Sequence, residues 1–281
     1  MPHALPAIDV LPLFPVLDRK LITLLQSLTP ADWQRLTLAR RWTVKDIAAH
    51  LLDGNLRTLS MLRDGYFGEA SGAINSYDDL LAFLNRLNAE WVTAMRRLSP
   101  VVLIELLIQS GREYAEFLAT LDPQAPAAFA VAWAGESESV NWFHIAREYT
   151  EKWHHQQQIR ETVGQTAELL TPELFRPFIE TFMRGLPHAY RQVAAPVGTV
   201  VQVRVTTASG GSWQLVKGEA GWRLQNVAPD AVLAAEVVLM PETAWRLFTK
   251  GIDPATAEAE SVLHGDRELA LAALRMVAVM A

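Results

Sequence analysis

Apolar positions recur at helical spacing through most of the first part of the chain. Thr43 with Asp46 resembles a capping box, with Asp in place of Glu, at the start of one helix, and Gly65 offers a stop. Pro172 suits the first position of another helix. The pattern predicts helices over residues 16–28, 43–64, 77–98, 101–121, 140–163 and 171–192. The economical architecture for the first 165 residues is a four-helix bundle, with room for a short extra helix.

The pattern changes to alternation near Pro196. Val201, Val203 and Val205 alternate with polar residues, which predicts a strand with one buried face. Further strands are predicted over residues 212–217, 222–226 and 235–239, and a strand with a turn over 261–266. Helices are predicted from 241 to just before Gly251 and over 267–280. The expected fold is therefore α+β with two domains. It comprises a helix bundle over 1–165, a connecting helix over 166–194 and a small C-terminal α+β domain with an antiparallel sheet over 195–281.

Composition narrows the classes of function. The formal net charge is -6 and no Lys/Arg-rich block occurs, so we expect no nucleic-acid partner. The chain has no cysteine, which excludes disulfides, Cys-ligated zinc and a Cys nucleophile. The apolar run 101–108 is too short to span a bilayer, and the N-terminus makes a poor signal peptide. We expect a cytoplasmic, membrane-free monomer or homodimer that acts on a small-molecule substrate.

One histidine, His50, lies within the apolar helical stretch WTVKDIAAHLLDGN. Farther along, Glu151 and His155 are four residues apart on one face of the helix predicted over 140–163. The pair is either a solvated surface pair or two of three ligands that converge with His50 on a metal. A carboxylate and two imidazoles suit Zn²⁺, and Ni²⁺, Fe²⁺ or Mn²⁺ also fit. His154 is the competing register, but one turn back it has only Thr150, a poor ligand.

These motifs are similar to those of a known family. A single His in W-T-V-K-D-I-A-A-H-L, followed about a hundred residues later by E-x-x-x-H, resembles the DinB-like metal-binding four-helix bundles, and more narrowly the mycothiol-dependent maleylpyruvate isomerase family. The tail, PETAWRLFTKG and HGDRELALAALRMVA, resembles the small sterol-carrier-like α+β domain of that family. The resemblance implies His50, Glu151 and His155 as metal ligands. It also implies a low-molecular-weight thiol cosubstrate, such as mycothiol or bacillithiol.

The sequence does not assign the catalytic residues, and each side chain near these three proposed ligands has more than one possible role. Arg147 and Gln158 either orient Glu151 or meet an anionic substrate; alternatively, Arg147 and Glu151 form an ordinary surface ion pair. Glu148 is a candidate proton acceptor. Arg57, seven residues after His50, points either into the same cavity or into solvent.

Two further polar residues have weaker patterns. Asp53, three residues after His50, either holds the second nitrogen of that imidazole or is an ordinary helix-surface carboxylate. His144, two turns before Glu151, is expected to be a surface histidine, with a spare metal ligand or a group that supports the ligands as the alternatives.

Three functions are consistent with the sequence. The leading hypothesis is a metal-dependent enzyme that uses a small thiol for cis-trans isomerisation or thiol transfer. A metal-water hydrolase, with Glu148 or an outer residue as proton acceptor, is the second. A protein that binds a metal or ligand without catalysis is the third.

Overall fold

The computed structural model describes residues 6–39, 41–68, 72, 74–225 and 231–279. These residues divide into two compact units. The helical unit comprises Val10–Ala128 and Glu151–Thr166, and the sheet unit comprises residues 6–9, Phe129–Thr150 and Ala167–Val279. The two units are defined by packing, whereas the predicted domains follow chain order. The two divisions therefore differ at residues 6–9, 129–150 and 166–194.

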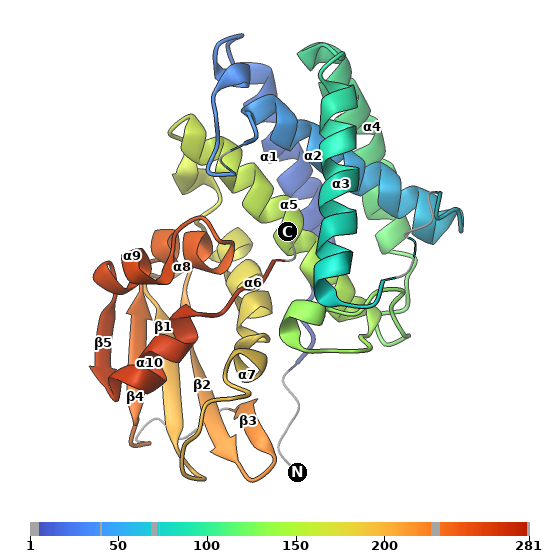
Figure 1. Cartoon of the computed structure of the whole chain (residues 1–281). Coiled ribbons are helices and arrows are strands. Elements are labelled where there is room, and N and C mark those ends of the chain that lie inside the picture. The colour runs from blue at the N-terminus through green and yellow to red at the C-terminus, as the bar shows by residue number, and fades with distance from the viewer. Residues whose placement is uncertain (1–5, 40, 69–71, 73, 226–230, 280–281) are drawn as a thin grey trace. The chain divides into compact units, whose positions relative to one another are not determined.

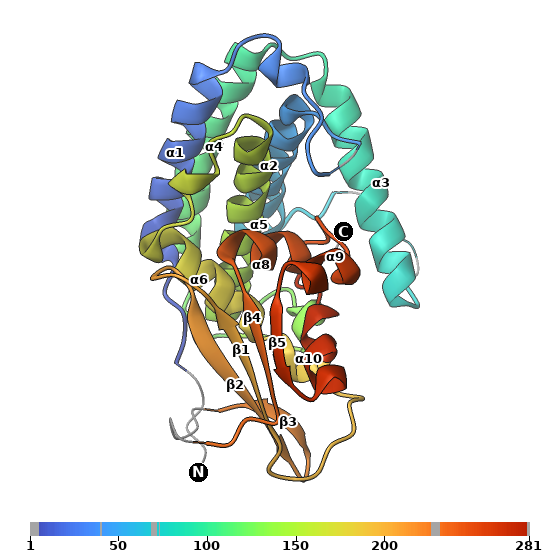
Figure 2. The same cartoon turned by 90° about the vertical axis from the view of Figure 1, so that its left-hand side faces the viewer.

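Four long helices and the second part of a fifth build the helical unit (Figure 1): α1 (Phe14–Ser27), α2 (Val44–Thr58), α3 (Tyr77–Met95), α4 (Pro100–Leu118) and residues 151–162 of α5 (Asn141–Thr162). Helix α2 packs against both α3 and α4, and α4 packs against α1. Figure 2 shows α1 and α4 side by side. Leu24, Ile47, Leu103 and Ile159 belong to one buried cluster. The predicted helical bundle is confirmed.

The start of α2 is fixed by the predicted capping box. The Thr43 hydroxyl accepts from the Asp46 amide at 3.2 Å, and the Asp46 carboxylate accepts from the Thr43 amide at 3.0 Å. These bonds satisfy amides that would otherwise lack partners at the helix start. After Thr58 the chain continues as a π-helical turn, Leu59–Arg63, and Gly65 ends it with φ of 68°. The cap sets where α2 begins, and His50 lies two turns beyond it.

A five-stranded sheet forms the frame of the sheet unit. Its strands are β1 (Val200–Val205), β2 (Gly211–Gly218), β3 (Gly221–Leu224), β4 (Ala235–Leu239) and β5 (Val262–Gly265), in the order β3-β2-β1-β4-β5. Val201, Val203 and Val205 are buried while Gln202 and Arg204 are partly exposed, as the alternation predicts. The β1–β4 pair is parallel and the other pairs are antiparallel, so the predicted antiparallel sheet contains one parallel pair.

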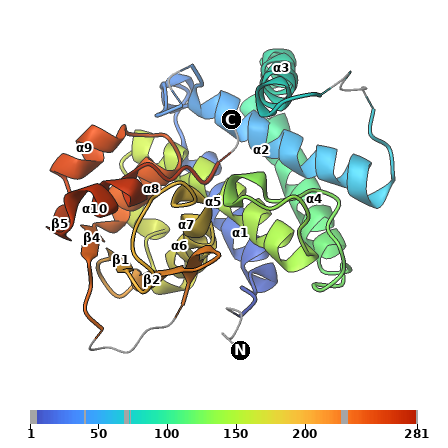
Figure 3. The same ribbon diagram turned by 60° about the horizontal axis from the view of Figure 1, so that its bottom comes forward.

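The sheet unit also contains helices. They are the first part of α5, α6 (Pro172–Met183), α7 (Leu186–Ala189), α8 (Pro241–Phe248), α9 (Pro254–Ala259) and α10 (Arg267–Leu274). Helix α10 contacts β4 and β5, beside which it lies in Figure 3. The helix predicted to reach residue 192 is interrupted at Arg184 and Gly185. The last helix ends at Leu274, before the predicted end at residue 280, which lies outside the described residues.

Across the described residues, no helix combines the length and apolar character needed to cross a membrane.

Candidate metal centre

Helices α2 and α5 bring His50 against His155 within the helical unit. The two imidazole rings meet edge to face, with centroids 4.7 Å apart, and the Trp42 ring lies 4.9 Å from that of His50. The Nδ1 atom of His50 is buried and has no hydrogen-bond partner. Burial, with the neighbouring His155, Arg57 and His154, holds the pKa of His50 well below its ordinary value. His50 is therefore a neutral imidazole whose buried nitrogen lacks a partner, at a cost of about 1–3 kcal/mol.

Glu151 and His155 lie one turn apart on α5, with Oε2 and Nε2 separated by 3.6 Å. The other ring nitrogen of His155, Nδ1, lies 2.9 Å from Oε1 of Gln158. Because an amide oxygen only accepts, Nδ1 carries the hydrogen and Nε2 presents its lone pair towards the carboxylate. Burial lowers the pKa of His155 to about 3, so at neutral pH no proton sits on Nε2. Two electron-pair donors thus face each other, which suits a cation between them.

The distances distinguish His155 from its neighbour His154. Two ligand atoms, each about 2.0–2.1 Å from a tetrahedral ion, lie about 3.4 Å from each other. The 3.6 Å between Glu151 and His155 is near that value, whereas the 4.0 Å from Glu151 Oε2 to His154 Nδ1 would require almost linear coordination.

His154 is nevertheless part of the cluster. The ligand atoms of Glu151, His154 and His155 all lie within 4.8 Å of one another, and His154 is buried. The sequence analysis paired His154 only with Thr150, the residue four positions earlier, and therefore did not select it as a ligand. The i,i+3 spacing to Glu151 was the signal that it overlooked. The donor set fits a divalent cation, with His50 and His154 as competing candidates for the third ligand.

Arg57 and Asp53 form an ion pair on α2, with Nη2 and Oδ2 separated by 2.8 Å. The same guanidinium nitrogen donates to Asn88 Oδ1 on α3 at 3.2 Å. Asp53 is 7% exposed, so it is not the ordinary surface carboxylate of the sequence analysis, and it does not bond His50 Nδ1, which has no partner.

Arg147 and Glu148 lie in the part of α5 that belongs to the sheet unit. They pair with each other at 2.5 Å, and Arg147 also donates to Nδ1 of His144 at 2.9 Å. His144 is only 1% exposed, so the expectation of a surface histidine is wrong. Its ring lies 6.3 Å from that of Phe129, and burial lowers its pKa to about 4.

Comparisons with known proteins agree with this architecture. The family model described as the mycothiol maleylpyruvate isomerase N-terminal domain matches residues 14–160. A crystal structure of a histidine-to-alanine variant of mycothiol-dependent maleylpyruvate isomerase resembles the chain with a TM-score of 0.54 and 12% identity, over 92% of this chain and 93% of that one. A second structure of mycothiol-dependent maleylpyruvate isomerase gives a TM-score of 0.51 and 13% identity, over 86% and 88%. At such identity the likeness shows the fold alone. No curated protein matches the chain in sequence.

Proposed function

Because the chain belongs to the mycothiol maleylpyruvate isomerase N-terminal domain family, we propose that it is a divalent-metal-dependent enzyme with a low-molecular-weight thiol cosubstrate. The reaction is cis-trans isomerisation or thiol transfer, and mycothiol is the first thiol to test. The proposed ligands are His50, Glu151 and His155, and the proposed ion is Zn²⁺, with Ni²⁺, Fe²⁺ or Mn²⁺ as substitutes. The observation that carries the proposal is the lone pair of His155 Nε2 facing the Glu151 carboxylate at 3.6 Å.

His50 rather than His154 is proposed as the third ligand for a geometric reason. The nitrogen of His154 lies 4.0 Å from Glu151 Oε2, farther than the 3.6 Å of His155 and farther than about 3.4 Å, the spacing of two ligands on a tetrahedral ion. His50 comes from a different helix and approaches the ring of His155 from another direction. Its partnerless Nδ1 shows that the imidazole retains unused bonding capacity.

The side chains of the candidate site are chemically suited to binding a thiol on a metal ion. A divalent cation bound there would lower the pKa of a thiol that reaches it and would polarise a substrate oxygen. One carboxylate and two neutral imidazoles balance only part of the charge of such an ion, which favours an anionic sulfur ligand. Gln158 fixes the tautomer of His155 through its contact with Nδ1. Since the chain has no cysteine, the nucleophilic sulfur must come from a cosubstrate.

The test is turnover by metal-loaded protein with and without thiols. Mycothiol and bacillithiol are offered with maleylpyruvate and with a general electrophile. We expect turnover that needs both metal and thiol and that is lost in Glu151→Gln. The matched control is Glu105→Gln, an exposed carboxylate on α4. Absence of turnover with every thiol would refute the proposal, and thiol-independent hydrolysis of esters would favour the metal-water hydrolase instead.

A further inference from the structure

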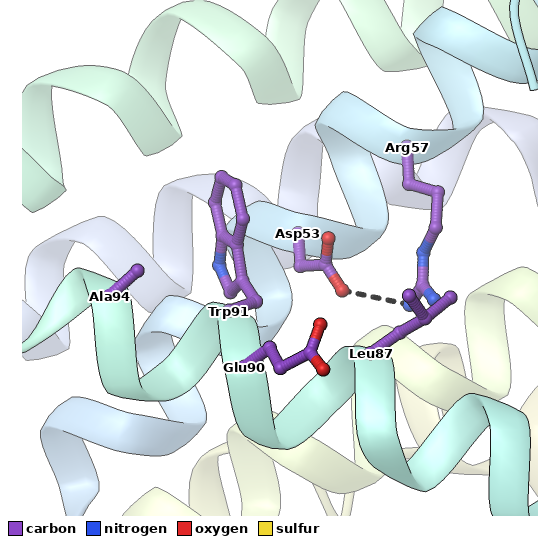
Figure 4. Close-up of a pocket in the computed structure, with 6 residues that line it drawn as sticks. All are labelled: Asp53, Arg57, Leu87, Glu90, Trp91 and Ala94. Atoms are coloured by element: carbon purple, nitrogen blue, oxygen red, sulfur yellow. Dashed lines mark ion pairs between the residues drawn. The ribbon is translucent and has the colours of Figure 1, made fainter. Parts of the chain in front are cut away.

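A pocket of about 330 Å³ lies between α2 and α3 of the helical unit. Figure 4 shows its walls, with two residues from α2 and four from α3: Asp53, Arg57, Leu87, Glu90, Trp91 and Ala94. This volume is at the small end of the range for ligand pockets. It has room for about one sugar-sized ring rather than for a whole cosubstrate.

The pocket adjoins the candidate metal centre along α2. Asp53 follows His50 by three residues, which places their Cβ atoms about 5–6 Å apart on one helix face. On the other wall, Trp91 donates its indole N–H to the carbonyl of Ala49, the residue before His50, at 2.8 Å. A ligand whose reacting end lies at His50 therefore has its other end within reach of the pocket.

The two carboxylates of the pocket, Asp53 and Glu90, differ in exposure: Asp53 is buried and Glu90 is exposed. The Oδ2 atom of Asp53 lies 2.8 Å from Arg57 Nη2, but the contact lacks hydrogen-bond geometry and the oxygen has no hydrogen-bond partner. The same guanidinium nitrogen donates to Asn88. Asp53 Oδ2 is enclosed by the protein and contacts a cation, so the carboxylate that the pocket presents to a ligand is that of Glu90, which is exposed.

The charges in the pocket argue against a carboxylate ligand. Arg57 is paired with Asp53, and Glu90 is paired with Arg86 at 3.1 Å, so among the described residues that line the pocket no cation is unpaired. Trp91 and Leu87 supply apolar surface. A neutral ring with hydroxyl groups at its edge and C–H groups on its faces meets both the Glu90 carboxylate and the indole.

We propose that the α2–α3 pocket binds a hydroxyl-rich ring at the non-reacting end of the thiol cosubstrate. Glu90 accepts a hydroxyl hydrogen, and Trp91 packs against the ring. The inference rests on the proposed function, because it assigns this pocket to the same thiol. Contacts at a remote end of a substrate hold its reacting end in place, so losing them weakens both binding and turnover.

The test blocks the pocket without touching its polar groups. Ala94 is exposed and lines the pocket, whereas Ala89 is exposed on the same helix and does not. Ala94→Trp fills the space, and Ala89→Trp makes the same chemical change outside it. The two readouts are kcat/KM with mycothiol against kcat/KM with N-acetylcysteine, and calorimetric binding of the thiol-free sugar portion of mycothiol.

We expect Ala94→Trp to lower the preference for mycothiol over N-acetylcysteine by at least about tenfold and to abolish sugar binding. Ala89→Trp should keep both. Equal preference and equal sugar binding in the two variants would overturn the pocket assignment. A wild-type protein that turns over every thiol equally would also overturn it while leaving the proposed function intact. Sugar binding that Ala94→Trp abolishes, in a protein with no thiol-dependent turnover, would support the pocket and refute the proposed function alone.

Discussion

Two buried histidines of α5, His155 and His144, have similar surroundings and different capacities. Burial lowers the pKa of both, to about 3 and about 4, so both rings are neutral near pH 7. In His144 the lone pair on Nδ1 already accepts from Arg147, and the hydrogen is left on Nε2. In His155 the hydrogen on Nδ1 is committed to Gln158, and the lone pair on Nε2 faces a carboxylate.

The difference shows that the hydrogen-bond partner, and not the burial, decides whether a buried imidazole has a free donor or a free lone pair. A guanidinium partner uses the lone pair and leaves a donor. An amide-oxygen partner uses the donor and leaves a lone pair, which is what a metal ligand needs. His155 therefore fits a cation, and His144 fits a structural role with Arg147 and Glu148.

The largest expected effect separates His50 from His154 as the third ligand. We expect His50→Ala to weaken Zn²⁺ binding by about 1,000-fold, well above the roughly 10–100-fold cost of losing a supporting residue. We expect His154→Ala to weaken it less than about tenfold, because its nitrogen lies outside tetrahedral reach of Glu151. Competition with a chelator of known affinity measures both. The reverse order would make His154 the ligand.

The next effect concerns pH and His144. Its pKa is about 4 in the folded chain and 6.5 ordinarily, so between these values the unfolded chain binds more protons. The free energy of unfolding therefore falls as pH decreases from about 6.5 to about 4, by an amount on the order of 3 kcal/mol for this group. Denaturant titrations in excess chelator should show a shallower fall for His144→Phe. Parallel curves for variant and wild type would contradict this reading.

A smaller effect tests the partner of His155. Gln158→Leu removes the acceptor for Nδ1 and frees the ring to change tautomer. We expect metal affinity to fall by roughly 10–100-fold while the fold is retained. The control is Gln165→Leu, at an exposed position after α5. Unchanged affinity in Gln158→Leu would mean that the contact does not orient the ligand.

The smallest effect tests the scaffold that carries His50. Thr43→Ala removes one half of the capping box of α2 and should cost about 1 kcal/mol of stability. Thr23→Ala is the control, because that exposed hydroxyl bonds only a carbonyl of its own helix. Thermal unfolding measures both variants. Equal Tm values would show that the cap does not stabilise α2.

Local patterns in the sequence account for most of the fold. The helical spacing located the long helices, and the Thr43–Asp46 spacing correctly predicted the cap of α2. The alternation of residues 200–205 correctly predicted a half-buried strand. The parallel pairing of β1 with β4 could not be predicted, because it depends on how strands distant in the chain are ordered across the sheet.

At the candidate site, too, the features that could not be predicted depend on contacts between residues that are distant in the sequence. The burial of His144 involves Phe129, which is remote from it along the chain and outside its helix. Arg57 bonds Asn88 on another helix, and no spacing rule within α2 indicates that contact. Helical spacing did bring Glu151 and His155 onto one face, but the role of Gln158 in fixing the tautomer needed the coordinates.

The most direct measurement of the central claim is metal content per chain after dialysis against Zn²⁺ and removal of excess ion. We predict one equivalent in the wild type and in His144→Ala, and none in Glu151→Ala or His155→Ala. Full occupancy in Glu151→Ala, or equal loss in His144→Ala, would contradict the distinction between the two histidines.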